Sequence, residues 1–166
     1  MFSNYNTKRL LLTKLNAADA AFIFNLVNTK AWIQYIGDRN IQTLEDAAKY
    51  IEKITANRNI SYWVVKLKET QKATGIITII KRDYLEYHDI GFAFLPEYTK
   101  KGYAFEAAST VLKEYFDSQK SNTVFAITIK ENLASIELLK KLGFMFTKEI
   151  RKENEDLLLY SVTTEA

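Results

Sequence analysis

The 166-residue sequence predicts one α+β domain over residues 1–166, with three α/β/α layers built on a mixed, mostly antiparallel sheet. Two observations predict it. Apolar residues recur at helical spacing in four segments, and the segments between them carry the alternating or continuous apolar runs of strands. Apolar residues make up 48% of the chain and charged residues 26%, with one proline and five glycines, which is typical of a folded domain with little linker.

The first third of the chain predicts a strand and two helices. Residues 7–15 hold three consecutive leucines among basic residues and are expected to form the first strand. Residues 16–27 and 43–57 each begin with a side-chain acceptor that is followed three residues later by an aspartate, which is the spacing of a capping box. Apolar residues continue at helical spacing in both segments, so we expect two helices.

Residues 29–40 lie between these helices and are aromatic and less regular. We expect a short helical turn that ends near Gly37. Trp32 and Tyr35 combine apolar rings with hydrogen-bonding tips, so they either cover the core or line a substrate cleft. The sequence leaves both interpretations open.

In the middle of the chain the apolar residues recur with a period of two, which is typical of strands. Residues 62–67 and 74–80 are rich in β-branched and aromatic residues and are separated by a polar segment, which predicts a hairpin. Residues 86–95 supply a third strand in series. Residues 102–116 follow as an apolar, alanine-rich helix.

The last third predicts a strand, a helix and a hairpin. Residues 122–129 are almost continuously apolar, as expected for a strand that is covered on both faces. A compact helix follows over residues 131–142, with lysines in its last turn and Gly143 just past its end. Residues 144–148 and 157–162 are expected to be strands on either side of a charged turn.

Composition excludes several classes of function. The chain has no cysteine and one histidine, His88, so disulfides, thiol nucleophiles and metal sites are not expected. A net charge of +3 is too small to predict a nucleic-acid partner. No apolar run approaches the roughly 20 residues of a membrane span, and the N-terminal segment lacks the blocks of a signal peptide. We therefore expect a cytoplasmic protein with no membrane partner.

The turn between the third strand and the next helix has the sequence Thr99-Lys100-Lys101-Gly102-Tyr103-Ala104. Backbone N–H groups point out of a helix N-terminus, where the macrodipole is positive, so this turn can bind a phosphate. The dinucleotide pattern GxGxxG and the nucleotide pattern GxxxxGK[ST] are both absent. By itself, a Lys-Lys-Gly turn is also compatible with a solvated surface loop.

Several short motifs occur in an order and at a spacing that resemble the GNAT superfamily of acetyl-CoA-dependent N-acetyltransferases. They are Gly75-Ile76-Ile77, Asp89-Ile90-Gly91-Phe92, Leu95-Pro96-Glu97-Tyr98, Lys101-Gly102-Tyr103-Ala104-Phe105-Glu106-Ala107, Asn132-Leu133-Ala134-Ser135 and Lys141-Leu142-Gly143-Phe144. The resemblance covers about residues 7–161 and is greatest to the branch that contains the ribosomal-protein N-terminal acetyltransferases. It implies the acyl-CoA N-acyltransferase fold, whose sheet splays at the CoA site, and acetyl-CoA as cosubstrate.

The resemblance also implies a set of CoA-binding residues. The turn corresponds to the family's Q/R-x-x-G-x-G/A pyrophosphate loop, with Thr99 at the Gln/Arg position and a lysine where this branch often has glycine. Its expected binding residues are Lys100, Lys101, Gly102, Tyr103 and Ala104. Phe94 and Leu95 are the expected backbone donors to the thioester carbonyl, near a bulge in their strand. Asn132 is expected to hold the pantetheine arm, and it also fits the N-cap of the following helix.

Two side chains match catalytic positions of similar enzymes. Asp89 is expected to remove a proton from the amine, directly or through water, and its alternative is a surface carboxylate at a strand start. Glu86 and Glu97 are weaker candidates. Ser135 is expected to protonate the departing thiolate, and its alternative is an ordinary helix serine. His88 and Asp89 are adjacent on a strand and point to opposite faces, so they cannot act as a pair.

The resemblance thus implies an N-acetyltransferase that acts on a primary amine, first of all a protein or peptide N-terminus. A polyamine or another small amine is the alternative acceptor, and a CoA-binding regulatory module without turnover is a second alternative. The candidate cleft segment, residues 29–40, contains one acid, Asp38, which disfavours a polycation. A nucleic-acid binder ranks last because acids are interspersed among the lysines. Both a monomer and a homodimer are compatible with the sequence.

Overall fold

The computed structural model describes residues 3–118 and 120–165. In chain order these residues form β1 (Tyr5–Asn6), β2 (Leu10–Lys14), η1 (Ala17–Asp19), α1 (Ala20–Val27), α2 (Lys30–Tyr35), α3 (Leu44–Ala56), β3 (Ile60–Leu67), β4 (Ala73–Ile80), β5 (Asp89–Phe94), η2 (Pro96–Tyr98), α4 (Tyr103–Asp117), β6 (Thr123–Thr128), α5 (Leu133–Lys141), β7 (Met145–Lys152) and β8 (Glu155–Thr163). The strands make one open sheet in the order β1-β2-β3-β4-β5-β6-β8-β7. Neighbours are antiparallel except for β5 and β6, which run parallel.

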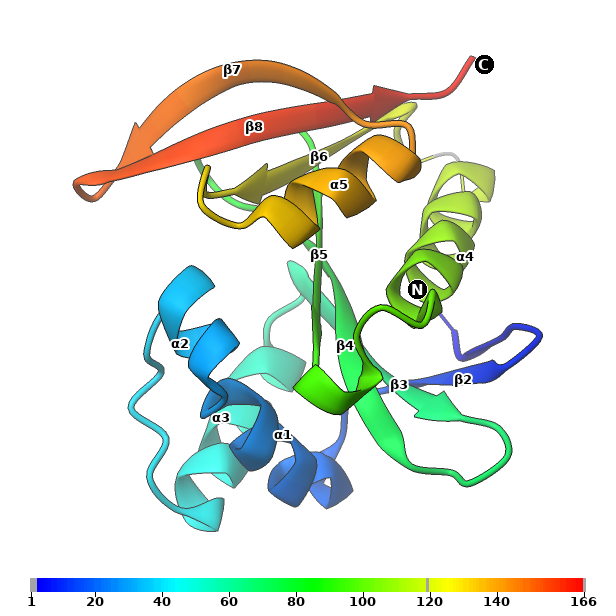
Figure 1. Ribbon diagram of the computed structural model, residues 1–166, viewed down its shortest axis with the longest axis vertical. Coiled ribbons are helices and arrows are strands. Elements are labelled where there is room, and N and C mark those ends of the chain that lie inside the picture. The colour runs from blue at the N-terminus through cyan, green and yellow to red at the C-terminus, as the bar shows by residue number, and fades with distance from the viewer. Residues whose placement is uncertain (1–2, 119, 166) are drawn as a thin grey trace.

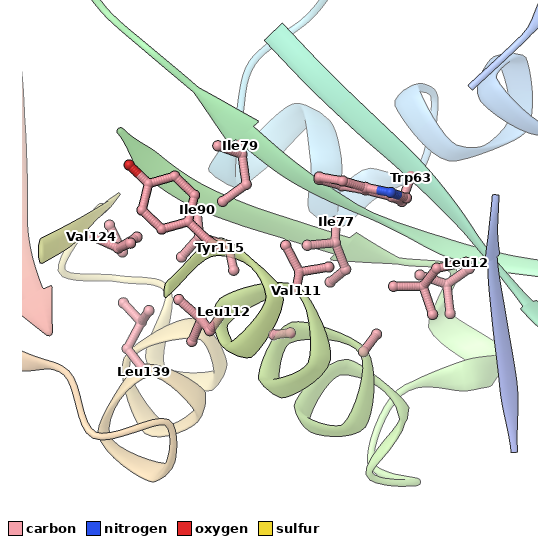
Figure 2. Packing of buried hydrophobic residues seen from close by; sticks show 14 of the residues in the cluster. Leu12, Trp63, Ile77, Ile79, Ile90, Val111, Leu112, Tyr115, Val124 and Leu139 are labelled. Carbon is pink, nitrogen blue, oxygen red and sulfur yellow. The ribbon is translucent and has the colours of Figure 1, made fainter. Parts of the chain in front are cut away.

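Helices pack on both faces of the sheet, which confirms the three-layer prediction (Figure 1). Because side chains alternate along a strand, Trp63 and Ile77 belong to the core beneath α4, together with Val111 and Tyr115 of that helix (Figure 2). Val64, the next residue after Trp63, belongs to the second core beneath α1, α2 and α3. Within the described residues, no helix is long and apolar enough to cross a membrane.

The capping boxes are present where the sequence predicts them. Asn16 accepts a hydrogen bond from the backbone of Ala18, and its own N–H donates to Asp19. Thr43 and Asp46 exchange the same pair of bonds at the start of α3. These local contacts satisfy N–H groups that have no partner inside the helix.

Replacing Thr43 with alanine is expected to lower the free energy of unfolding by about 1 kcal/mol, because one N-cap bond of α3 is lost. Urea unfolding measures this difference. Thr55→Ala on the same helix is the matched control, because the Thr55 hydroxyl donates only to carbonyls of its own helix, those of Ile51 and Glu52. Equal stability of the Thr43→Ala and Thr55→Ala variants would contradict the assigned cap.

The sheet opens between β5 and β6. These strands pair at a single position, Asp89 with Phe125, where the Phe125 N–H donates to the His88 carbonyl at 2.9 Å. Beyond it the two strands diverge (Figure 1). On β6, Val124 and Ala126 are buried, whereas Phe125 and Ile127 are half-buried. The face that carries Phe125 and Ile127 is therefore only partly covered, whereas the sequence predicts a strand that is covered on both faces.

Two element boundaries also differ from the prediction. The third strand begins at Asp89, because the preceding loop folds on itself: Lys81 Nζ donates to the carbonyls of Arg82 and Leu85. The final hairpin is longer than expected, because β7 and β8 continue to a tight turn at Glu153 and Asn154, where both residues have positive φ. This turn brings the end of the hairpin to the opening in the sheet.

Candidate active site

Two cavities meet where β5 and β6 part. The loop-side cavity has a volume of about 630 Å³ and is bordered by the turn before α4, by α2 and by α5. The sheet-side cavity has a volume of about 600 Å³ and is bordered by strands β3 to β6 and by the β7–β8 turn. Both cavities are lined by Trp32, Tyr35, Ile36, Phe92, Ala93, Asn132 and Ser135. A molecule in one cavity can therefore contact a molecule in the other at these shared residues.

The turn before α4 has the backbone of an anion site. Lys100 has φ +60° and Gly102 has φ +81°, so both residues adopt the left-handed conformation. Alternation of right- and left-handed residues turns successive N–H groups to one side, and α4 adds the free N–H groups of its first turn. Lys100, Gly102, Tyr103 and Ala104 line the loop-side cavity, whereas Lys101 does not. The Thr99 hydroxyl donates to the Pro96 carbonyl within its own turn.

Residues far away in the sequence contact this turn on the side that does not line the cavity. Arg9, just before β2, donates from Nη1 to the Lys101 carbonyl at 3.0 Å and from Nε to Glu106 of α4 at 2.8 Å. Glu106 also accepts hydrogen bonds from the Arg9 backbone and from the Thr7 hydroxyl. These contacts could not be predicted from the sequence, because no local pattern joins Arg9 to a helix more than 90 residues later.

One of the two expected backbone donors on β5 is already occupied. The Leu95 N–H donates to the Thr74 carbonyl of β4 at 2.8 Å, so it is not free to bind a ligand, contrary to the prediction. Adjacent N–H groups of a strand point to opposite edges, so those of Phe94 and Phe92 point toward the opening. The β4–β5 register is continuous from Gly75 to Ile80, without the expected bulge.

Asn132 and Ser135 lie at the start of α5. The Asn132 side chain accepts the Ser135 N–H at 3.3 Å, which confirms the predicted N-cap. Both residues line both cavities. The cap therefore places the Ser135 hydroxyl at the point where the cavities meet.

Asp89 is buried rather than on the surface, which excludes the alternative of a surface carboxylate. Its side chain is 2% exposed and lines the sheet-side cavity. Arg82 donates from Nε to Asp89 Oδ2 at 2.6 Å. Burial raises the pKa of Asp89 above that of an ordinary aspartate, and the Arg82 guanidinium opposes part of this increase. Glu86 and Glu97 are exposed and line neither cavity.

His88 and Asp89 point to opposite faces of the sheet, as expected. The His88 ring is half-buried, and its Nδ1 lies 2.9 Å from the Tyr115 hydroxyl of α4. Burial and nearby lysines lower the pKa of His88. His88 is therefore a packing residue of the α4 side.

The sheet-side cavity has a polar wall of tyrosines and charged residues. The hydroxyls of Tyr50 and Tyr62 lie 3.5 Å apart, and burial raises the pKa of Tyr62. The Arg39 guanidinium lies 5.9 Å from the ring of Trp32, which is itself part of the second core. Three cations and three carboxylates line this cavity: Arg39, Arg82, Lys152, Asp89, Glu153 and Glu155. Its charge is therefore balanced.

A family model for the acetyltransferase (GNAT) domain matches residues 9–145. The chain belongs to the GNAT acetyltransferase family. One relative of this GNAT chain, a Bacillus subtilis (strain 168) protein with the description uncharacterized N-acetyltransferase YnaD, is 30% identical over 165 residues, which cover 96% of each protein. Acetyltransferases of this family use acetyl-CoA, and the chain is an N-acetyltransferase.

Two solved structures with different acceptors share the fold of this GNAT chain. A ribosomal-protein-S5-alanine acetyltransferase from Vibrio fischeri has a TM-score of 0.80 and 22% identity, and the match covers 96% of both chains. A spermidine N-acetyltransferase from Vibrio cholerae, solved with CoA and spermine, has a TM-score of 0.79 and 18% identity, with 95% and 96% covered. At these identities the likeness shows the fold and leaves the acceptor open.

Proposed function

We propose that the enzyme transfers the acetyl group of acetyl-CoA to the primary amine of a protein or peptide N-terminus. The observation that carries the proposal is the meeting of the two cavities at Phe92, Asn132 and Ser135. A donor in the loop-side cavity and an amine in the sheet-side cavity would be in contact there. The choice of a protein or peptide N-terminus as acceptor is also supported by the resemblance of the motifs to the ribosomal-protein N-terminal acetyltransferases.

The residues of the loop-side cavity fit CoA. The left-handed residues Lys100 and Gly102, together with the first turn of α4, present N–H groups to a diphosphate. The Asn132 side chain lies farther along the same cavity, where it can contact the pantetheine arm. When bound there, acetyl-CoA supplies a thioester carbonyl close to β5. The N–H groups of Phe92 and Phe94 would then polarise that carbonyl.

Two side chains would move protons. An amine with a pKa near 10 is mostly protonated at neutral pH, so a base must act first. Asp89 keeps Oδ1 available while Arg82 holds Oδ2, and its raised pKa makes it a stronger proton acceptor than an ordinary aspartate. We assign Asp89 as the base, acting through water. The Ser135 hydroxyl would give a proton to the thiolate sulfur.

The charge of the sheet-side cavity favours a peptide end over a polyamine. A polyamine carries several positive charges and needs an excess of carboxylates, whereas the cavity holds equal numbers of cations and carboxylates. The hydroxyls of Tyr50 and Tyr62, together with Arg39, can donate hydrogen bonds to peptide carbonyls. A polyamine or other small amine remains the second candidate, supported by the shared fold of the spermidine enzyme.

An acceptor panel tests this assignment. Purified enzyme and acetyl-CoA are mixed with short peptides, the same peptides with blocked N-termini, spermidine and simple amines, and free thiol is followed. We expect kcat/KM for free peptide N-termini to exceed that for spermidine by at least about tenfold. Turnover of spermidine alone would select the second candidate. CoA binding without turnover of any amine would favour the regulatory module.

Replacing Ser135 with alanine is expected to lower kcat about 100-fold, the low end of the range for general-acid catalysis. The reason is that the thiolate would have to take its proton from water. The KM for acetyl-CoA is expected to change little, because the Ser135 hydroxyl is assigned to the leaving sulfur. Steady-state kinetics measure both constants, with Ser121→Ala, outside both cavities, as the control. An unchanged kcat would remove Ser135 from the mechanism.

A further inference from the structure

Arg9 contacts the diphosphate-binding turn from the side opposite the cavity. Its guanidinium donates to the Lys101 carbonyl and to Glu106, and it lies 4.5 Å from the centre of the Tyr103 ring. Arg9 Nη2 also lies 3.2 Å from the point that a Cβ atom on Gly102 would occupy. Gly102 lines the loop-side cavity, whereas Arg9 does not. Arg9 therefore lies on the side of the turn that faces away from the loop-side cavity.

The planarity of the peptide bond gives this contact a consequence on the cavity side. In a trans peptide the carbonyl of one residue and the N–H of the next point in opposite directions. Arg9 holds the Lys101 carbonyl on its own side of the turn. The N–H of Gly102, in the same peptide plane, is thereby directed away from Arg9.

Glu106 makes this arrangement rigid. Its carboxylate accepts bonds from the Arg9 side chain, the Arg9 backbone and the Thr7 hydroxyl. These contacts lower the pKa of Glu106, although its partial burial opposes them, so the carboxylate stays ionised at neutral pH. The guanidinium is thus fixed between the first turn of α4 and the Lys101 carbonyl before any ligand binds.

We infer that Arg9 is a positioning residue for CoA, which orients the Gly102 N–H toward the diphosphate from outside the binding cavity. The inference rests on the proposed binding of CoA by this turn. An oriented N–H costs no rearrangement when the ligand arrives, so the gain is in affinity for CoA. Lys100 and Lys101 are exposed and add charge, but neither fixes the direction of this peptide group.

The test compares wild-type protein with Arg9→Met and Arg9→Lys. Methionine removes the charge and both hydrogen bonds, whereas lysine keeps a charge beside Glu106 but cannot also hold the Lys101 carbonyl. Calorimetry is expected to show a dissociation constant for CoA about tenfold higher in both variants. The KM for acetyl-CoA is expected to rise by the same factor with kcat within twofold, and melting without ligand shows whether each variant is folded.

Arg151→Met is the matched control, because Arg151 makes an exposed ion pair with Asp156 on the final hairpin and lines neither cavity. Its CoA affinity is expected to equal that of the wild type. Wild-type affinity in folded Arg9→Lys, or a loss confined to kcat, would overturn the inference. If Arg9→Met does not fold, Arg9→Lys decides the question alone. Failure of the wild-type protein to bind CoA would instead overturn the proposed function.

Discussion

Replacing Gly102 with valine is expected to abolish CoA binding. The φ of +81° at this position is strongly unfavourable for a β-branched residue, and the new Cβ would lie 3.2 Å from Arg9 Nη2. The turn must therefore move, and the N–H groups that are proposed to bind the diphosphate would move with it. Losing two charge-assisted hydrogen bonds, each about 1.5–3 kcal/mol, corresponds to a loss of affinity of more than about 100-fold.

The stabilisation of the protein by CoA measures this effect. Saturating CoA is expected to raise the melting temperature of the wild-type protein and to leave that of Gly102→Val unchanged. Gly143→Val is the matched control, because Gly143 also has a positive φ, at +92°, but follows α5, and a Cβ there would make only an ordinary contact with Val162 at 3.9 Å. An undiminished shift in Gly102→Val would mean that CoA does not bind at this turn.

Replacing Asp89 with asparagine is expected to lower kcat/KM at least about 100-fold, because the amide cannot accept the amine proton. The fold is expected to lose little stability, because asparagine resembles the protonated aspartic acid that the raised pKa of Asp89 shows the fold to favour, and Arg82 is 32% exposed to solvent. CoA binding is expected to persist, because Asp89 does not line the loop-side cavity. Kinetics, urea unfolding and calorimetry separate these three effects. Asp156→Asn, in an exposed ion pair, is the control.

The pH dependence of the wild-type enzyme distinguishes a base from a structural carboxylate. Burial raises the pKa of Asp89, so kcat/KM is expected to fall with decreasing pH at a higher pH than an ordinary aspartate would give. A raised pKa in the folded state means that the native protein binds this proton more tightly than the unfolded chain. Protonation of Asp89 therefore favours folding, and activity is expected to decline before the protein unfolds. A rate that does not change over this range would exclude Asp89 as the base.

Features set by neighbouring residues could be predicted from the sequence. The capping boxes at Asn16 and Thr43 and the N-cap at Asn132 each depend on residues within one turn of helix. The three-layer arrangement could also be predicted, because apolar periodicity determines which side of each helix and strand is buried. The motifs then identified the family and the turn that is proposed to bind CoA.

Features set by distant contacts could not be predicted. Arg9 reaches Lys101 across 92 positions, and a lone arginine just before a strand has no local sequence signal. The occupied N–H of Leu95 depends on the β4–β5 register, since a shift of one residue would have freed it. Arg82 lies close to Asp89 in sequence, but only the compact loop between β4 and β5 turns it back onto the carboxylate.

The single pairing position between β5 and β6 has a consequence for the order of events during turnover. Because the opening has two cavities that share one set of residues, the donor and the amine can be bound at the same time in the two cavities proposed for them. Neither substrate has to leave before the other enters. The architecture therefore favours a ternary complex and direct transfer between bound partners, in which the protein never carries the acetyl group itself.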